Sequence, residues 1–398
     1  MQDVRLSSLR DSYLHLLKSA VEIVRPLFYS FLEFCSINLT LLKDLIGGVI
    51  TIRKETTMNL TIRKVDLNNS KEVTEIRKVG SRAFFNFSFL WLFLPKPTAD
   101  SFIALLGDEI VSAFLYKVYG KGDKQIAYIN YFFTDPKHHG KGYGKQLFSA
   151  GMEHIRAQNF MMLVSFVRDD NVGSWLNFVK NGFLRVPFTE LIPKLGFGRA
   201  FHLYAASLFG FCFGHDFYIS ENGQGVQKEP NSFGQIVLSL LVNAALLLPL
   251  ALTYEPLPIY SSFLAIFVGL ALFGYIGTRL SERKWNFRLA DGGLLLCSIF
   301  SITMGFMPMS ANWYPERYEN TPQFRRDIAM PSIFSWVFLI ALGLAWSAAA
   351  PLVSVLLIFR CMIFAEPMKS YGGLRVYEWN KGLFWVLVAA SVWVAFIA

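Results

Sequence analysis

Residues 135–146, DPKHHGKGYGKQ, place glycines at 140, 142 and 144 among lysines and histidines. A run that leaves a strand at Pro136 and then opens a helix exposes backbone N–H groups at the positive end of a helix dipole, and such groups bind phosphate. Glycine leaves room for a ligand and permits a positive φ angle. Lys141 and Lys145 add positive charge. The same spacing also allows a glycine-rich turn that only joins strand to helix.

The surrounding periodicity predicts the elements that position this loop. From Met58 the apolar pattern alternates between periods of about 2 and about 3.6 residues. Strands are expected at NLTIRKV, SFIALL, EIVSAFLYKVY, KQIAYINYFFT, FMMLVSFV and FLRVPF. Helices are expected at NNSKEVTEIRKVGSRAFF, at GKQLFSAGMEHIRAQ, and at NVGSWLNFVKNG, which begins with an Asn171 cap and stops at Gly182. The pattern predicts an α+β domain in which helices cross a mixed sheet.

The motif TDPxxHGKGYGK resembles the acetyl-coenzyme A signature of the GNAT N-acetyltransferases. In that family a hydrophobic strand and a proline precede Arg or Gln, and His139 stands at this position here. Some thirty residues later, NVGSWLNFVKNGF resembles the second motif of the family, an Asn-headed helix that ends in Gly-Phe. The resemblance covers about residues 58–207 and implies a GNAT-like mixed sheet with flanking helices.

The resemblance also implies how acetyl-coenzyme A would bind. The loop amides of residues 139–144 would hold the pyrophosphate, and the backbone edge of residues 132–134 would pair with the pantetheine arm. The candidate cofactor-binding residues are Phe132, Phe133, Thr134, His139, Gly140, Lys141, Gly142, Tyr143, Gly144, Lys145, Asn171 and Phe178.

The catalytic groups are less clear than the cofactor loop. Acyl transfer to an amine needs a base for the amine and an acid or a stabiliser for the leaving thiolate. A tyrosine often has the second role in the resembling family, but this chain carries Phe178 there. The strand before the loop has no carboxylate, although Asn130 or Tyr131 could position a water molecule. The catalytic residues therefore stay unknown, and a head that binds acyl-coenzyme A without turnover is an open alternative.

Two other ligand classes are not expected. The net charge of +9 is not gathered into a basic face with interleaved aromatics, so we expect no nucleic acid partner. Cys212, His215 and Asp216 lie close together in sequence, and His202, placed on the last strand of the domain, precedes them. No second cysteine or histidine pair follows at a zinc-binding spacing, so we expect packing rather than a metal.

The second half of the chain is mostly apolar. Runs long enough to span a bilayer occur near 233–253, 257–280, 292–310, 333–364 and 382–398. The fourth could be one tilted or kinked helix or two spans, and one span is preferred. The pattern predicts an all-α polytopic membrane domain of about five spans behind the GNAT-like domain.

Charge predicts the orientation of these spans. With the head in the cytoplasm, loop 279–288 lies inside with its four basic residues, and the connection 254–256 lies outside. Loop 311–332 then lies outside despite its arginines. We therefore expect external labelling to reach Asn312 but not the 279–288 loop.

The membrane tail also resembles, more faintly, the site-2 protease family of membrane metalloproteases, around residues 281–308 and 365–385. Its zinc ligands are missing, because FVGLALFGYIGTRL has no His or Glu and Tyr371 precedes Gly372. This resemblance implies an inactive protease scaffold, and ordinary membrane helices are the alternative.

The predicted organisation has four parts: an N-terminal amphipathic or undefined extension (1–57), a GNAT-like domain (58–207), a junction (208–232) and a transmembrane domain (233–398). The expected activity is transfer of an acetyl group from acetyl-coenzyme A to an unknown amine at the lipid bilayer, without a metal.

Overall fold

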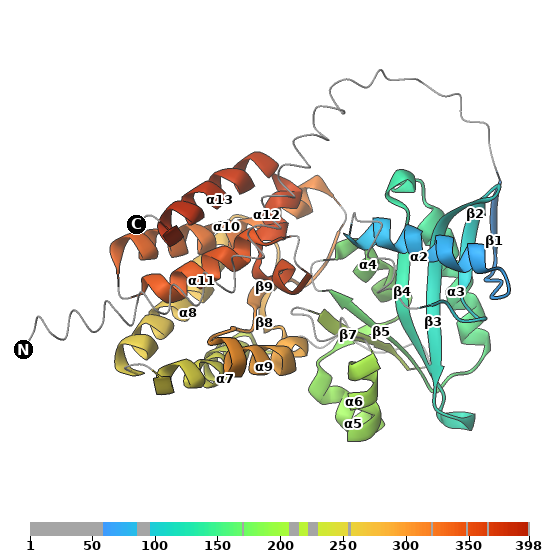
Figure 1. Ribbon diagram of the computed structural model, residues 1–398, viewed down its shortest axis with the longest axis horizontal. Helices are drawn as coiled ribbons and strands as arrows, with labels where there is room; N and C mark the ends of the chain where they lie inside the picture. Colours follow the sequence, from blue (N-terminus) through green and yellow to red (C-terminus); the bar gives the residue numbers. More distant parts are fainter. Residues whose placement is uncertain are drawn as a thin grey trace, which may run out of the picture.

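The computed structural model describes residues 59–85, 96–168, 171–206, 215–221, 230–253, 256–319, 321–347, 349–363 and 366–396. The extension predicted for residues 1–57 lies outside them. Figure 1 shows two parts, a sheet with flanking helices and a bundle of helices, joined by a short ribbon of two strands. We refer to these parts as the head and the tail.

The head is built on one seven-stranded sheet of order β1-β2-β3-β4-β5-β7-β6. Its strands are β1 (Leu60–Lys64), β2 (Phe102–Leu106), β3 (Glu109–Tyr119), β4 (Ile126–Thr134), β5 (Met162–Arg168), β6 (Leu184–Val186) and β7 (His215–Ser220). All pairs are antiparallel except β4 and β5, which run parallel. The six strands expected from the sequence are present, and the sheet is mixed as predicted.

Helices cover both faces of this sheet. They are α2 (Ser70–Phe85), α3 (Tyr143–Ala157), α4 (Val172–Lys180), α5 (Phe188–Leu195) and α6 (Phe197–Ala206). The predicted apolar face of α3 is confirmed, because Leu147, Gly151 and Ile155 are all buried. A Cβ atom on Gly151 would lie 2.8 Å from the Phe114 ring, so glycine lets α3 lie close to β3.

The end of the head differs from the sequence prediction in two ways. His202 lies on helix α6, not on the last strand, because the buried side chains Ala200, Leu203 and Tyr204 follow helical spacing. The last strand is β7, which lies within the predicted junction and inserts between β5 and β6. The sheet therefore extends to Ser220, beyond residue 207.

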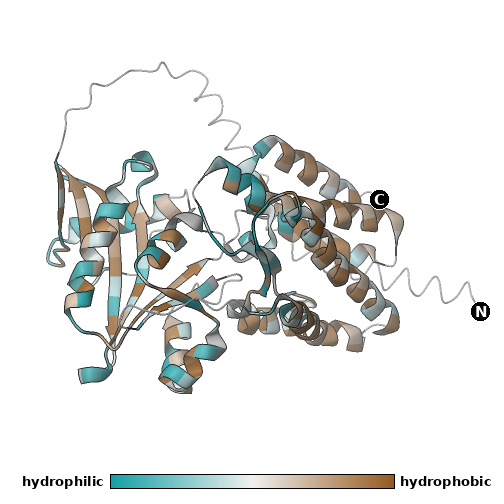
Figure 2. Ribbon diagram, turned by 180° about the vertical axis from the view of Figure 1, so that it is seen from behind, coloured by the Kyte–Doolittle hydropathy of each residue, from teal (hydrophilic) through white to brown (hydrophobic). Residues whose placement is uncertain are grey.

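The tail is helical apart from two short strands. Its elements are α7 (Ser232–Thr253), α8 (Pro256–Thr278), β8 (Trp285–Leu289), α9 (Leu294–Met304), β9 (Ala311–Pro315), α10 (Pro322–Ala345), α11 (Ala350–Cys361), α12 (Gly373–Trp379) and α13 (Lys381–Phe396), with short 3-10 turns at Asp291–Gly293 and Glu366–Tyr371. Within the described residues, α7, α8 and α10 are long and apolar enough to cross a membrane. Figure 2 shows that the tail helices consist mostly of hydrophobic residues, whereas hydrophilic and hydrophobic residues are mixed in the head.

Two of the predicted spans are wrong. The 292–310 segment contains only the 11 residues of α9, about 16 Å of helix against the roughly 30 Å of a hydrocarbon core. The 333–364 segment is two helices, because α10 ends at Ala345 and α11 begins at Ala350. Composition alone hides this break, since both helices are apolar.

The predicted placement of two loops on opposite sides of a membrane is also wrong. Strand β8, in the 279–288 region, pairs antiparallel with β9, so that Arg288 lies opposite Asn312. Arg283 also forms ion pairs with Glu319, at 3.0 Å, and with Asp327, at 2.7 Å. The two loops therefore lie side by side. The segment between them, which contains the short helix α9, begins and ends at the paired strands β8 and β9.

The β8–β9 ribbon and its flanking loops contact the head. The ring of Trp175, on α4, lies 4.0 Å from the ring of Tyr318, which follows β9. The Tyr204 hydroxyl of α6 donates a hydrogen bond to the carbonyl oxygen of Gly292. Tyr318 in turn packs with Tyr314, Phe324 and Ile328. The head thus contacts the tail through side chains of α4 and α6.

Candidate functional site

The glycine loop joins the end of β4 to the start of α3. Asp135 and a 3-10 turn at Pro136–His138 end the strand, and α3 begins at Tyr143. Gly140 and Gly142 have φ angles of 78° and 80°, which L side chains rarely adopt. Gly142 is the N-cap of α3 and offers no side-chain hydrogen bond to the first amides. Those N–H groups are therefore available to a ligand, as an anion site at a helix start requires.

The three glycines have two different roles. A Cβ atom added to Gly140 or Gly142 would meet no atom within 4 Å, so the space over the loop is open. A Cβ on Gly144 would lie 2.5 Å from the Thr134 hydroxyl and 3.3 Å from the Phe132 ring. Gly144 therefore lets α3 lie against the end of β4, and only the first two glycines shape the open loop.

A buried ion pair holds the start of the loop. Asp135 is 1% exposed, and its Oδ2 accepts hydrogen bonds from Nε and Nη2 of Arg82, on α2, at 2.9 and 2.7 Å. Burial favours the neutral acid, but the backbone N–H of Lys137 and the guanidinium of Arg82 outweigh it and lower the pKa of Asp135. The loop is therefore tied to α2 by a carboxylate that stays charged at neutral pH.

The two histidines of the loop have different partners. The Nε2 atom of His139 lies 2.9 Å from the Thr134 carbonyl oxygen, so the ring folds back onto the end of β4. The Nε2 atom of His138 lies 3.3 Å from the Glu109 carboxylate, on β3. Lys141 and Lys145 are exposed beside the loop. His139 thus supports the loop, and the exposed lysines supply the charge around it.

Strands β4 and β5 separate next to the loop, as Figure 1 shows. Their parallel pairing runs from Ile126 and Met162 to Ile129 and Ser165, where the Ser165 hydroxyl donates to the Ile129 carbonyl at 3.0 Å. Beyond that point β4 pairs with β3 alone, while β5 pairs with β7. Among the strands that the structure describes, none lies beside the β4 edge at residues 130–134 on the β5 side, and this edge leads directly into the glycine loop.

Asn130 lies at the point of separation. The β3–β4 register passes from Leu115 opposite Tyr131 to Tyr116 opposite Ile129, so Asn130 is a bulge residue without a strand partner. Its Oδ1 atom is buried and accepts no hydrogen bond from the residues described. A buried acceptor of this kind requires a water or a ligand. The structure therefore brings the glycine loop, the free β4 edge and the Asn130 carbonyl group to one place.

The second motif forms α4 as predicted, and its two candidate residues have structural contacts. The Asn171 side chain accepts a hydrogen bond from the Ser174 N–H at 3.2 Å and caps the helix. Phe178 is 2% exposed and packs edge to face with Phe148 and Phe183, at 5.1 Å each. Phe178 is thus a core residue, and its ring packs against other core rings.

Some residues around the site could not be found from the sequence. Arg82 and Asp135 are 53 positions apart, and no local pattern links them. Tyr218 lies on β7 opposite Ser165, and its ring is near Phe178. Burial and the charge of Asp216 raise the pKa of Tyr218 well above its usual value. The position of Tyr218 depends on the insertion of β7 between β5 and β6, and the periodicity of the sequence does not predict this insertion.

The Cys212, His215 and Asp216 group is only partly described, because Cys212 lies outside the described residues. Asp216 is buried beside Arg185, with 3.6 Å between Oδ1 and Nη1. No group of three or more metal-binding side chains occurs in the part of the chain that the structure describes.

Several solved structures are similar to the head. The ribosomal-protein-S18-alanine N-acetyltransferase from Escherichia coli is 12% identical over 43% of this chain and 99% of its own, with a TM-score of 0.29. Ard1 from Thermoplasma volcanium is 18% identical over 41% of this chain and 97% of its own, with a TM-score of 0.28. N-acetylglutamate synthase from Neisseria gonorrhoeae, complexed with coenzyme A and N-acetyl-glutamate, is 15% identical over 43% of this chain and 36% of its own, with a TM-score of 0.30.

Among curated proteins no sequence matches this chain. A family model does match part of the head. The matched segment begins at the first residue of α2 and ends just after α4, so it includes the glycine loop, the separating strands and the second motif. Residues 70–183 match the model of the acetyltransferase (GNAT) family, and the head has a GNAT-like fold.

Proposed function

We propose that the head transfers an acetyl group from acetyl-coenzyme A to an amine, and that the tail holds this reaction at a membrane. The observation that carries the proposal is the junction of three features: a loop with two positive-φ glycines at a helix start, a β4 edge without a β5 partner, and a bulge between them. The family match at residues 70–183 supports the same reaction class.

The loop and the strand edge suit different parts of coenzyme A. The amides at residues 140–144 would bind the pyrophosphate, with Lys141 and Lys145 beside it, whereas the His139 N–H already donates to the Pro136 carbonyl oxygen. The edge of β4 at residues 130–134 that faces away from β3 would pair with the amides of the pantetheine arm as a strand would. This arrangement would bring the thioester to the bulge at Asn130.

The chemistry at the bulge requires proton transfer. The amine nitrogen attacks the thioester carbonyl, the C–S bond breaks, and the amine loses one proton while the thiolate gains one. Asn130 Oδ1, buried and without a described donor, would hold a water molecule that accepts the proton of the amine. Phe178 has no proton to give, so the thiolate would take its proton from water, which balances the proton that the amine gives up.

The alternative is a head that binds acyl-coenzyme A without turnover, on a tail whose sequence resembles an inactive site-2 protease. The core packing of Phe178 favours this alternative, because no ionisable group stands at that position. The resemblance of the tail to site-2 proteases remains a sequence-based hypothesis.

The experiment that separates the two readings uses the full chain in detergent. Coenzyme A binding is measured by calorimetry, and turnover is measured as free thiol released from acetyl-coenzyme A with a panel of amines. Amine-dependent thiol release that falls in Asn130→Ala supports the transferase. Binding without release for any amine supports the sensing head, and no binding at millimolar coenzyme A contradicts both.

We further propose that the head and the β8–β9 ribbon lie on the cytoplasmic side. The basic residues of both flanking loops then share one side, which removes the exception that Arg317, Arg325 and Arg326 would otherwise make to the positive-inside rule. In a chain whose native cysteines are replaced by serine, external reagents should label Thr253→Cys but neither Glu282→Cys nor Arg317→Cys. Labelling of Glu282→Cys and Arg317→Cys from opposite sides would contradict the arrangement.

A further inference from the structure

The tail buries three arginines, and one of them differs from the other two. Arg288 and Arg375 lie over the ring of Tyr314, with 4.0 and 4.6 Å between the guanidinium carbon and the ring centre. Arg360 is 7% exposed, and the hydrogen bond that the structure gives it runs from Nη1 to the Ser332 carbonyl oxygen, at 3.2 Å. No carboxylate of the described residues forms an ion pair with Arg360. A buried guanidinium in apolar surroundings is costly unless an anion accompanies it.

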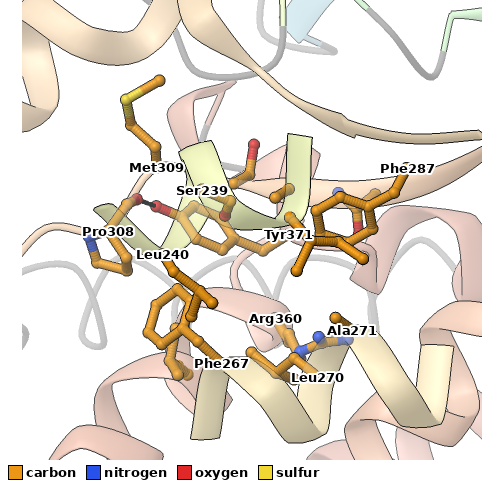
Figure 3. Close-up of a pocket in the computed structure, with 15 residues that line it drawn as sticks. Ser239, Leu240, Phe267, Leu270, Ala271, Phe287, Pro308, Met309, Arg360 and Tyr371 are labelled. Carbon is orange, nitrogen blue, oxygen red and sulfur yellow. Dashed lines mark hydrogen bonds between the residues drawn. The ribbon is translucent and has the colours of Figure 1, made fainter. Parts of the chain in front are cut away.

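Arg360 faces a cavity lined by helices α7, α8 and α11 and by residues 308–312, as Figure 3 shows. The space open to the centre of a water-sized sphere is about 40 Å³, which is room for a few water molecules or a small ligand group. Ser310 also lines this cavity, and its hydroxyl is buried without a hydrogen-bond partner among the described residues. Two buried donors thus line one cavity.

The other polar groups of the cavity are already engaged. The Tyr371 hydroxyl donates to the Pro308 carbonyl oxygen, a contact drawn in Figure 3. Asn312 donates from Nδ2 to the Ser370 carbonyl at 2.8 Å. The Ser239 hydroxyl lies 3.4 Å from Nδ2 of Asn243. The cavity therefore offers a guanidinium and a hydroxyl to a ligand, a donor set that suits an anion.

We propose that this cavity binds the carboxylate group of a small or lipid-like acid, with Arg360 as its counter-charge and Ser310 as a second donor. A single guanidinium neutralises a monovalent anion, whereas a doubly charged phosphate would leave a buried negative charge. The planar fork of arginine pairs with the two oxygens of a carboxylate, and a spherical halide cannot use both donors in this way. This site is separate from the coenzyme A site proposed for the head.

A carboxylate could come from two sources. A free small acid would fill the polar corner next to Arg360. A fatty acid would also place its chain along the apolar wall formed by Leu240, Phe267 and Leu356. Both sources share the same recognition of the carboxylate by Arg360, and a chain-length comparison separates them.

The test measures the thermal unfolding of the full chain in detergent against concentration for sodium acetate, sodium decanoate and methyl decanoate, at constant ionic strength set with sodium chloride. A ligand that binds only the folded chain raises Tm once its concentration exceeds Kd, and Tm then continues to rise with the logarithm of the concentration. We expect this rise with a carboxylate, loss of the shift in Arg360→Gln, and a Ser310→Ala chain that needs about tenfold more ligand for the same shift. The matched control Arg317→Gln, which removes an exposed arginine, should respond like wild type.

The comparison of acetate, decanoate and methyl decanoate distinguishes a small acid from a fatty acid and shows whether the proposal fails. A Tm rise with acetate alone identifies a small acid, and a rise that begins at a lower concentration of decanoate identifies a fatty acid. The proposal is overturned if no carboxylate raises Tm above the sodium chloride control, if methyl decanoate gives the same shift, or if Arg360→Gln responds like wild type. If Arg360→Gln does not fold, Ser310→Ala decides, and an unchanged affinity in that variant rejects the site.

Discussion

Two helices of this chain, α3 and α12, each begin with a glycine N-cap in the left-handed conformation, but the surroundings of the two glycines differ. Gly142 is the N-cap of α3 with a φ angle of 80°, and Gly372 is the N-cap of α12 with a φ angle of 90°. Around Gly142 a Cβ atom would meet nothing within 4 Å, whereas at Gly372 it would lie 2.8 Å from the Ser332 hydroxyl. The same backbone conformation thus occurs in an open loop in the head and in a packed turn in the tail. A glycine pattern identifies the conformation, and only the surroundings identify its use.

The largest effect should come from filling the sealed turn. In Gly373→Ala the new Cβ atom would lie 1.8 Å from the Arg360 carbonyl oxygen, so the backbone of α11 or α12 must move. We expect destabilisation of more than about 3 kcal/mol, measured as a fall in Tm of the full chain in detergent. Gly198→Ala, a helical glycine with nothing within 4 Å, is the matched control and should not lower Tm. Equal Tm values for the two variants would show that the turn is not tightly packed.

The open loop should respond in ligand binding rather than in folding. Valine at Gly142 must adopt a left-handed conformation that costs about 1–2 kcal/mol, and its side chain would stand in the proposed phosphate position. We expect coenzyme A affinity to fall at least about tenfold in Gly142→Val by calorimetry, with an unchanged circular dichroism spectrum. If the variant binds like wild type, the loop is only a connection between β4 and α3.

The ion pair below the loop should have a smaller effect, and one that depends on pH. Asp135→Asn replaces a buried carboxylate that accepts from Arg82, and we expect a loss of about 1–3 kcal/mol in unfolding free energy. Because the folded-state pKa of Asp135 is lowered, this contribution is complete above about pH 4 and is lost as the pH falls through the lowered pKa.

Denaturant unfolding of both proteins between about pH 3 and pH 8 measures this difference. The exposed pair Lys64–Asp100 is the control, and Asp100→Asn should change stability by less than about 1 kcal/mol. A difference between Asp135→Asn and wild type that grows at acid pH would contradict the assignment, because the sign would then be reversed.

The smallest effect is expected at Lys141. Its side chain is exposed beside the loop, so Lys141→Ala removes a charge that water and salt already screen. Coenzyme A affinity should fall less than about threefold, and the difference should shrink as salt is added. A loss as large as that in Gly142→Val would mean that the lysine, rather than the loop backbone, holds the phosphate.

Local patterns were sufficient for most of the head. The strands, the caps at Asn171 and Gly182 and the position of the glycine loop follow from periods and turn residues that lie within a few positions of each other. Helices α5 and α6 and strand β7 were missed. The pairing of β7 between β5 and β6 is a long-range feature, so no local period announces it.

The tail shows a different limit. An apolar run identifies a region of burial or membrane contact, but it does not mark where one helix ends, as the break between Ala345 and Ala350 shows. The β8–β9 ribbon is formed by two short segments that lie among charged residues, and α9 separates them in the sequence. At the site, the loop motif was visible in the sequence, whereas the Arg82–Asp135 pair depends on the packing of α2 against β4.

The position of β7 has a consequence for how the chain is made on the ribosome. Among the described strands, β6 pairs only with β7, and residues 215–220 of β7 are synthesised after it. Domains generally fold as units while the chain grows from its N-terminus. Because α7 begins at Ser232, soon after β7 ends, the last strand of the sheet and the first apolar helix emerge almost together. Completion of the head therefore coincides with the moment at which the translation machinery must handle the first apolar helix.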